Sequence, residues 1–370
     1  MYFFNDNFLE IKKFGIKEGG VVRNNAWIRY LKDDCKMKVT FVNFVFTNKI
    51  LKYLNYVYFC FRCIFIKNSK IFFLYPKVGL PILTKGGKGD VYRKVFLVMV
   101  KKLIANGNDL IFDVSDVKYE QAIDLRLDNL DLPKIKVFED EFFSLGQYYV
   151  FASYSMKEYI QNKYNIDEQK CEVCINGGYE FLKCDKKFDI VNKDKISYVY
   201  AGTLNKGRMI EEMINVFPNA SDKELILIGT GGEWINEFLS KCGKTNVQYY
   251  GEFVESEASL IVSQCDVGLI PYDSSRFYYN IAYPTKLSFY ITAGIPFLST
   301  PVNEVKLVLN HYKIGYAAEI EDWTELIDSL TKDNIEKLKD DVKMVKHNFY
   351  WKEVFKKSVI VNGTTRDIAE

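Results

Sequence analysis

The 370-residue sequence lacks several features that would point to particular kinds of protein. It has only two histidines, His311 and His347, which we expect to be structural, so a histidine base is not predicted. Its longest apolar stretch, residues 40–73, is interrupted by charges such as Lys52 and Arg62 before about 18 uncharged residues accumulate. Neither end carries a signal peptide or a lipidation motif. These absences argue against a membrane-spanning helix and predict a cytoplasmic protein.

Support for metal chemistry is also sparse. The eight cysteines are spread over both halves, which is typical of reduced thiols rather than of a disulfide framework. Two Cys-x-x-Cys pairs, Cys60/Cys63 and Cys171/Cys174, leave a four-thiolate zinc site open, but their apolar neighbours favour buried free thiols. No Asp-x-Asp motif stands in a suitable loop. We therefore expect catalysis without a bound metal and without a cofactor.

What the sequence does contain is an ample core and an uneven charge. With 48% hydrophobic and 26% charged residues it is typical of a folded protein, and its length suits two domains. Residues 1–105 hold 20 Lys or Arg against 6 Asp or Glu, so the rest of the chain must carry −12 to give the net +2. The basic part predicts contact with something anionic, such as membrane headgroups, a lipid-pyrophosphate or nucleic acid. A scattered, solvated surface is the alternative.

Short apolar segments alternate with helical patterns along the whole chain. Strands are predicted first at residues 37–46, 70–75, 109–114 and 148–152, and then at 196–201, 224–229, 247–250, 267–271 and 295–299. This alternation predicts two doubly wound α/β domains with parallel sheets. The predicted domains are residues 1–182 and residues 183–348, and the second begins with a charged linker. Residues 349–370 are predicted to form a terminal helix that packs back toward the first domain.

Two glycine turns follow predicted strands in the second domain. The first, residues 200–208, stands where a strand ends and a helix begins, so that free amides, a helix dipole and two cations could hold a diphosphate. Its candidate binding residues are Gly202, Thr203, Lys206 and Arg208. An ordinary turn with surface cations is the alternative. The second turn, around Gly229, matches neither a dinucleotide fingerprint nor a P-loop and indicates only a close approach of the backbone.

The most informative stretch is residues 278–296. Pro284 fits the turn before a helix, Thr285 its first residue and Gly294 its end, so Lys286 falls in the first turn. Here the chain resembles GT-B glycosyltransferases, especially the bacterial hexosyltransferases that include galactofuranosyltransferases and a glucosyltransferase of glycosylated adhesins. Those enzymes carry an Asn-x-Pro-x-Lys helix followed by Tyr-(Leu/Ile)-x-Ala-Gly-x-Pro. The resemblance also covers the two glycine turns, Gly251 and the aromatic segment 349–353.

The resemblance implies a GT-B fold of two facing Rossmann-like domains and a nucleotide-sugar donor, UDP-linked, bound by the second. The donor diphosphate would contact the turn 202–208 and the segment Pro284 to Lys286, and Tyr250 would lie near the base. On the acceptor side, Gly19 and Gly20 resemble the first loop of many family 4 glycosyltransferases. Where those enzymes often hold the donor with a glutamate, this chain has Phe289, and the glucosyl and galactofuranosyl relatives also tend to lack that glutamate.

Two carboxylates are the candidates for proton transfer. Asp113 and Asp116 come at the end of a predicted strand and could reach an acceptor hydroxyl as a general base. For Asp116, capping of the next helix is the alternative. If the enzyme retains configuration, no strong base is needed, and cations on the leaving group contribute most of the stabilisation.

These patterns together predict a hexosyltransferase of bacterial surface-polysaccharide or glycoprotein biosynthesis. Its partners would be the nucleotide-sugar and a saccharide or lipid-linked acceptor, with peripheral contact to an anionic membrane and no nucleic acid. Monomer and oligomer both stay open. The alternative is a catalytically silent GT-B-like protein that supports another transferase.

Overall fold

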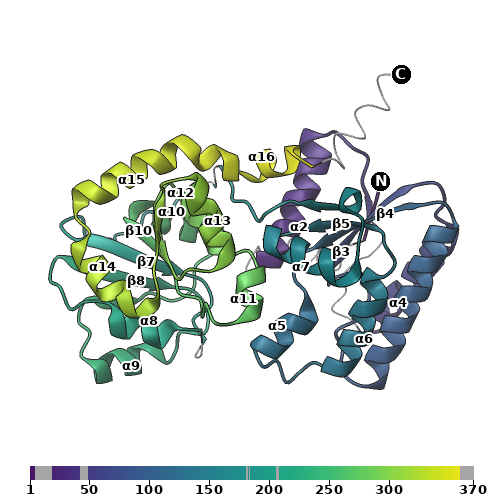
Figure 1. Ribbon diagram of the computed structural model, residues 1–370, viewed down its shortest axis with the longest axis horizontal. Helices are drawn as coiled ribbons and strands as arrows, with labels where there is room; N and C mark the ends of the chain where they lie inside the picture. Colours follow the sequence, from purple (N-terminus) through teal and green to yellow (C-terminus); the bar gives the residue numbers. More distant parts are fainter. Residues whose placement is uncertain (5–18, 42–48, 181, 183, 206–207, 359–370) are drawn as a thin grey trace. The chain divides into compact units, whose positions relative to one another are not determined.

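The computed structural model describes residues 1–4, 19–41, 49–180, 182, 184–205 and 208–358 (Figure 1). The chain divides into two compact units: unit 1 is residues 1–175 with 355–370, and unit 2 is residues 176–354. The division falls seven residues before the boundary predicted at residue 182. The end of the chain, from Phe355 onward, belongs to unit 1.

Unit 1 is built on a six-stranded, all-parallel sheet with the order β2-β1-β3-β4-β5-β6. Its strands are β1 (Tyr2–Phe4), β2 (Thr40–Phe41), β3 (Lys70–Tyr75), β4 (Asp109–Val114), β5 (Tyr148–Phe151) and β6 (Cys171–Val173). The strands are nearly continuous apolar runs, as expected when helices cover both faces of a parallel sheet. Aromatic rings stack from strand to strand, with Phe4 on Phe73 at 4.5 Å and Phe73 on Phe112 at 5.1 Å between centroids. The core of unit 1 is therefore aromatic.

The helices of unit 1 lie between its strands, as the predicted alternation of strands and helices requires. They are α2 (Gly19–Arg29), a π-helical turn (Tyr30–Asp34), α3 (Lys49–Phe65), α4 (Gly87–Ala105), α5 (Lys118–Asp124), α6 (Leu132–Phe143), α7 (Tyr154–Tyr164) and a 3₁₀ turn (Glu168–Lys170). Gly19 and Gly20 form the first turn of α2 rather than the predicted loop before it, and their role on the acceptor side stays a prediction. Helix α4 begins at Gly87, directly after Gly86, whose left-handed φ of 77° redirects the chain.

The last helix, α16 (Trp351–Lys356), runs from unit 2 into unit 1. Within unit 1, Phe355 stacks on Trp27 of α2 with ring centroids 3.7 Å apart, and the Ser358 hydroxyl donates a hydrogen bond to the Glu172 carboxylate. These contacts explain why the end of the chain joins the first unit, since stacked, buried rings contribute well beyond their buried area.

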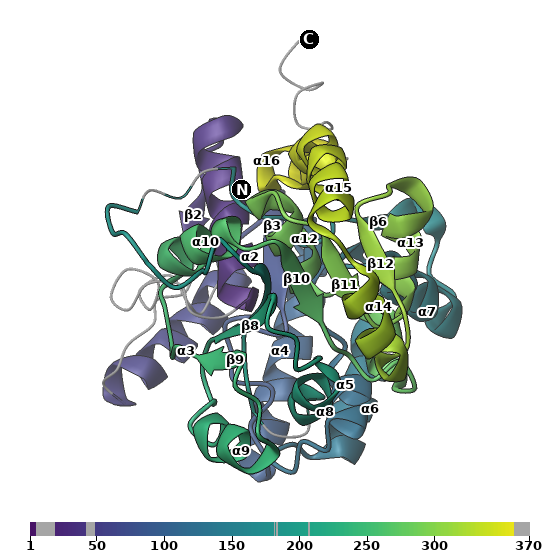
Figure 2. The same ribbon diagram turned by 90° about the vertical axis from the view of Figure 1, so that its left-hand side faces the viewer.

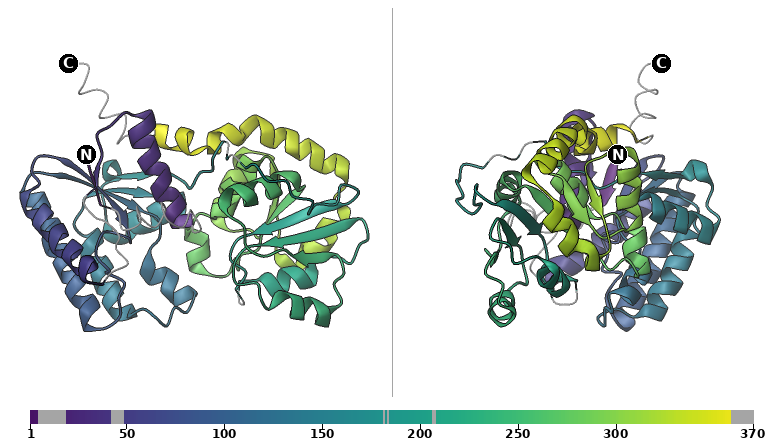
Figure 3. Two further views of the ribbon diagram at one scale, coloured as in Figure 1. Left: turned by 180° about the vertical axis from the view of Figure 1, so that it is seen from behind. Right: turned by 60° about the vertical axis from the view of Figure 1, so that its left-hand side comes forward.

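Unit 2 has the strand order β12-β11-β10-β7-β8-β9, again all parallel. The left-hand view of Figure 3 shows the teal and green strands of this sheet from behind. The strands are β7 (Ile196–Ala201), β8 (Lys223–Ile228), β9 (Val247–Tyr249), β10 (Val267–Ile270), β11 (Phe297–Ser299) and the unpredicted edge strand β12 (Gly315–Ala317). The α-helices are α8 (Ile210–Val216), α9 (Ile235–Cys242), α10 (Glu255–Gln264), α11 (Phe277–Ile281), α12 (Thr285–Ala293), α13 (Asn303–His311), α14 (Trp323–Ser329) and α15 (Lys332–Val345); 3₁₀ turns span Ile320–Asp322 and Lys346–Phe349. The prediction of two doubly wound parallel sheets is confirmed.

Two further predictions concern thiols and membrane crossing. All eight cysteines are free thiols, and burial raises the pKa of Cys63 and Cys174. In the described ranges no three His, Cys, Asp or Glu side chains gather as metal ligands would. Among the helices of those ranges, none is both long enough and apolar enough to span a bilayer.

Candidate functional site

The strand order of unit 2 locates its binding edge. The chain runs outward from β7 first toward β9 and then, after crossing back, from β10 toward β12, so the order reverses between β7 and β10. Ligands of doubly wound sheets bind at the carboxyl ends of the strands beside such a reversal. The loop after β7, the loop after β10 and the start of α12 supply residues to this edge.

Two glycines at this edge allow the backbone to approach closely. Gly229 has φ 140°, and a Cβ atom there would lie 1.8 Å from the carbonyl oxygen of Gly202. Gly202 has φ 148°, and its Cβ would lie 2.8 Å from Cε of Lys286. A side chain at either position would therefore separate the loops after β7 and β8 or displace the lysine.

Hydrogen bonds fasten the two glycine turns to each other. The Leu204 amide donates to the Thr230 carbonyl at 2.7 Å, and the Trp234 indole donates to the Leu204 carbonyl at 2.8 Å. The Tyr249 hydroxyl donates to the Gly229 carbonyl at 3.0 Å. These hydrogen bonds hold the backbone of the two glycine turns in a fixed position. We call the surface that the two turns form the glycine floor.

Lys286 projects over this floor from the first turn of α12. As predicted, Pro284 immediately precedes the helix, Thr285 is its first residue and Gly294, at φ 89°, ends it. The ammonium of Lys286 lies 4.8 Å from the ring centroid of Tyr200 and 5.6 Å from that of Tyr272. We call these three residues the Lys286 cage. Aromatic faces attract a cation without neutralising its charge.

The charge of Lys286 is uncompensated. Loss of hydration, together with the nearby Arg208 cation, lowers the pKa of Lys286 to about 7. Neither Lys286 nor Arg208 has an ion-pair partner among the side chains that the structure describes. Two unpaired cations beside glycine turns are suited to an anion of at least two charges, because its charge would offset both cations and would favour the protonated form of Lys286.

The rings of the Lys286 cage are themselves held in place. The Tyr200 hydroxyl donates to the Thr203 carbonyl at 2.8 Å, and the ring of Tyr272 stacks on Tyr279 at 4.6 Å. The Tyr272 amide also donates to the Thr300 hydroxyl at 2.9 Å. Tyr200 and Tyr272 were not among the predicted site residues. The only signal in the sequence is that each lies at the carboxyl end of a strand.

The loop after β7 differs from its prediction in one respect. Helix α8 begins at Ile210, beyond the whole motif, because Met209 takes a left-handed conformation with φ 58° and redirects the chain. The predicted helix dipole at Gly202 is therefore wrong; Gly202 and Thr203 begin an extended loop. Lys206 lies outside the described residues. Arg208 is described, with a partly exposed side chain.

Two further positions from the sequence analysis, Tyr250 and Phe289, also lie in unit 2. Tyr250 follows β9, and its hydroxyl donates to the Gln248 side chain. The next residue, Gly251, accepts a hydrogen bond from the Gly229 amide at 2.8 Å, so Tyr250 adjoins the second glycine turn, and its contact with a base stays a prediction. Phe289, one turn after Lys286, is partly buried beside Tyr290 and supplies no carboxylate.

In unit 1 the structure separates the two predicted carboxylates. Asp113 lies within β4 and accepts hydrogen bonds from Nε and Nη2 of Arg23 at 2.8 and 2.5 Å, with both side chains only 1% exposed. Arg23 also donates to the carbonyls of Cys174 and Ile175. Asp113 therefore ties α2 to the sheet, and both its oxygens are engaged, which corrects the interpretation of Asp113 as an available base.

Asp116 is more accessible. Its side chain is 29% exposed and forms an ion pair with Lys118 at 3.1 Å. Helix α5 begins after Val117, and the backbone amides of Lys118 and Tyr119 donate to the Glu139 carboxylate at 2.7 and 3.2 Å. Glu139 caps this helix, so the alternative that Asp116 caps it is wrong. Its role as a general base stays a prediction.

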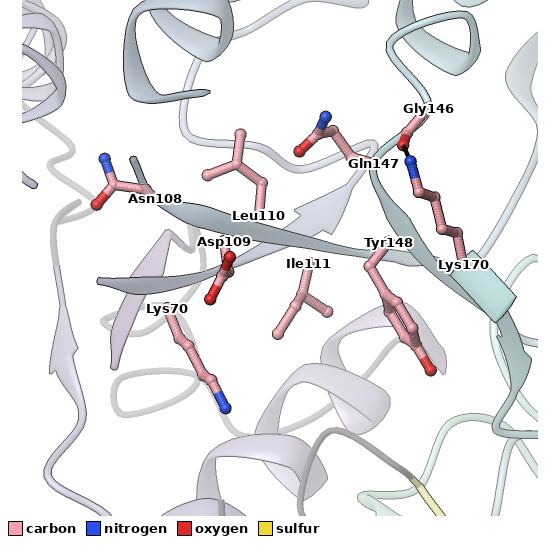
Figure 4. A pocket seen from close by; sticks show the side chains of 9 residues that line it. All are labelled: Lys70, Asn108, Asp109, Leu110, Ile111, Gly146, Gln147, Tyr148 and Lys170. Carbon is pink, nitrogen blue, oxygen red and sulfur yellow. Dashed lines mark hydrogen bonds between the residues drawn. The ribbon is translucent and has the colours of Figure 1, made fainter. Parts of the chain in front are cut away.

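Unit 1 also has a hollow of about 350 Å³, shown in Figure 4. It lies at the first residues of β3, β4 and β5, and its lining includes Lys70, Asp109 and Tyr148. This is the edge opposite to the carboxyl ends of the strands, and no predicted site residue lines it. The hollow is thus separate from the candidate site.

Comparison with known proteins bears on these observations. Residues 198–361, less than half of the chain, match the family model described as Glucosyltransferase 3-like, C-terminal domain. This range contains the Lys286 cage and both glycine turns. A search of curated protein sequences gives no match.

Solved structures resemble the whole chain. The Anabaena protein HepE, in complex with UDP-glucose, has 10% identity and a TM-score of 0.62 over 99% of this chain and 98% of its own. Sucrose-phosphate synthase from Thermosynechococcus elongatus has 11% identity and a TM-score of 0.61 over 88% of this chain and 81% of its own. The lipopolysaccharide outer core galactosyltransferase WaaB has 13% identity and a TM-score of 0.59 over 98% and 99%.

At such identities these likenesses establish the fold, which is the predicted GT-B fold. The prediction of a GT-B glycosyltransferase is confirmed at the level of the fold and of the C-terminal domain. Residues 198–361 are thus similar to a glucosyltransferase 3-like C-terminal domain, and the chain has the GT-B fold.

Proposed function

We propose that this protein transfers a hexose from a UDP-sugar to a saccharide or lipid-linked acceptor in bacterial surface-polysaccharide or glycoprotein biosynthesis. One observation carries the proposal. Lys286 and Arg208 are unpaired cations beside the glycine turns, at the edge where the strand order of unit 2 reverses between β7 and β10. The solved HepE complexes contain UDP and UDP-glucose, and WaaB is described as a galactosyltransferase, which supports this choice of donor.

The proposed chemistry follows from charge. As the sugar departs, negative charge develops on the nucleoside diphosphate, and a cation that is already in position stabilises it without reorganisation. Lys286 supplies such a cation from a rigid helix, and Arg208 supplies a second. We propose that these side chains, with the backbone at Gly202 and Gly229, bind the diphosphate without a metal ion or a cofactor.

Nucleotide binding is tested by thermal unfolding with a panel of UDP-, ADP- and GDP-sugars. We expect UDP-sugars to raise the midpoint, because a ligand that binds only the folded protein stabilises it. Lys286→Ala should reduce the shift strongly, whereas Lys337→Ala, which removes an exposed lysine of α15, should leave it unchanged. A panel without any shift, or equal shifts in both variants, would refute the placement of the site.

Turnover separates an enzyme from a silent partner protein. An active transferase should release free UDP from the stabilising donor when acceptor saccharides or lipid-linked saccharides are added. Binding without release over a broad acceptor panel, together with co-purification of another transferase, would favour the silent GT-B-like partner instead.

The expected location belongs to the same proposal. We place the protein in the cytoplasm, peripherally at the inner face of the plasma membrane, where a lipid-linked acceptor would be presented. The excess of 14 positive charges in residues 1–105 supports contact with anionic lipid.

A further inference from the structure

Helix α3, labelled in Figure 2, has many large apolar side chains that are exposed to solvent. Of the nineteen exposed large hydrophobic side chains in the described ranges, nine lie on this 17-residue helix. Single exposed apolar residues are ordinary, but a contiguous patch of this size marks a binding surface. The six most exposed members, with 54–71% of each residue accessible, are Ile50, Tyr53, Leu54, Val57, Phe61 and Phe65, which we call the α3 face.

The α3 face is one continuous stripe. At 100° per residue these six positions fall within about 120° of the helix circumference. The opposite side of α3 is already used, because Phe59 and Cys63 are fully buried and the Phe59 ring meets Phe4 at 5.2 Å. The ring of Tyr56 packs against the ring of Tyr92 in α4, with 5.4 Å between the ring centroids. The helix is thus anchored by one side while its apolar stripe points away from the core of unit 1.

Charge around the stripe indicates what covers it. Residues 49–105 contain twelve Lys or Arg and a single acidic residue, Asp90, and α3 itself has no acidic residue. A second copy of the chain seated face to face would bring together two α3 helices that contain Lys and Arg but no acidic residue to pair with them. A nucleic acid would satisfy the cations but leave the aliphatic stripe in water. An anionic bilayer offers both partners, acyl chains for the stripe and headgroup charges for the lysines.

We propose that α3 lies in the headgroup region of an anionic membrane with the α3 face toward the acyl chains. The depth of insertion is that of an interfacial helix, about 5–10 Å, since the opposite side of α3 stays packed on unit 1. This inference rests on the membrane contact proposed above and names the helix that makes it; it depends on unit 1 and not on the donor site of unit 2.

Co-sedimentation with vesicles tests it. The full chain is mixed with phosphatidylcholine vesicles containing about one-third phosphatidylglycerol, and with pure phosphatidylcholine vesicles. We expect binding to the anionic vesicles that weakens as salt rises. The double variant Leu54→Glu with Phe61→Glu should lower the partition coefficient at least tenfold, since two apolar side chains leave the membrane and two negative charges enter. Val137→Glu is the matched control, because Val137 is 65% exposed on α6.

Two further readouts guard against misfolding and other occupants. Phe61→Trp should bind as the natural chain does, and its added emission should shift to the blue with anionic vesicles, whereas Val137→Trp should show no shift. Lack of vesicle binding, equal binding of the double variant, or a dimer in solution that the double variant dissociates would each overturn the proposal. So would salt-sensitive binding to duplex DNA in place of vesicles. UDP-sugar stabilisation, measured without lipid, reports on the donor site separately.

Discussion

The two units share an architecture but differ in where their functional chemistry is exposed. Both are six-stranded parallel sheets between helices. In unit 2 the carboxyl edge of the sheet carries glycine turns and two unpaired cations. In unit 1 the corresponding part of β4 carries a buried carboxylate paired with Arg23, and the excess of positive charge is a property of residues 1–105 as a whole. The same architecture thus carries a buried ion pair in unit 1 and, in unit 2, the two unpaired cations of the proposed donor site.

The largest expected effect tests the anchor of unit 1. Asp113→Asn should destabilise the protein by about 3–5 kcal/mol, because the buried Arg23 would lose its counter-ion. Replacing both partners, Arg23→Met with Asp113→Leu, should recover much of that loss, and Asp116→Asn should cost little. The measurement is urea unfolding of each variant. Unchanged stability with lost transfer activity would instead restore Asp113 as a base.

The next effect tests the glycine floor of unit 2. Gly229→Ala should cost about 3 kcal/mol, since its Cβ would lie 1.8 Å from a backbone oxygen in a conformation that favours glycine. Gly243→Ala is the control: its φ is 67° and no atom lies within 4 Å, so only about 1 kcal/mol of backbone strain is expected. If urea unfolding gave the same loss of unfolding free energy for both variants, the loops after β7 and β8 would be able to separate without an energetic cost.

Titration of Lys286 gives a pH-dependent prediction. Its pKa is lowered to about 7, so the free protein holds this proton below pH 7 and loses it above, while a bound diphosphate retains it. Affinity for UDP-glucose should therefore be level below pH 7 and fall by up to about tenfold per pH unit above it. UDP-glucose has no phosphate proton that titrates in this range.

Two substitutions isolate this titration. Lys286→Arg keeps its charge at every accessible pH and should remove the slope, and Lys286→Met should bind weakly at all pH values. Calorimetric titration across the pH range measures both. A slope that survives in Lys286→Met would assign it to another group.

The smallest expected effect concerns the Lys286 cage. Tyr272→Leu removes one aromatic face and should weaken UDP-glucose binding about fivefold, whereas Tyr272→Phe keeps the face and should bind normally. Tyr272→Leu should also displace the midpoint of the pH profile, which a purely structural effect would leave in place. Identical losses in the Leu and Phe variants would point to the hydroxyl rather than to the ring.

Predictions from the sequence succeeded where local rules decide. The helix from Thr285 to Ala293 follows from Pro284 and Gly294, and the apolar strands with their turns gave the two sheets. Boundaries failed where a single residue overrides the pattern. Met209, with its positive φ, delays the start of α8 beyond the glycine turn where the helix was predicted to begin.

The sequence by itself determined the alternation of elements, the excess of positive charge in residues 1–105 and the position of Lys286 in its helix, because periodicity, capping and charge are local properties. Only the tertiary structure decided which side chains contact one another. Arg23 meets Asp113 across 90 residues, and one side of α3 is buried while the other faces solvent. Tyr200 reaches Lys286 from strand β7, and Tyr272 reaches it from the loop after β10. Such contacts depend on strand order and packing, and no pattern along the chain encodes them.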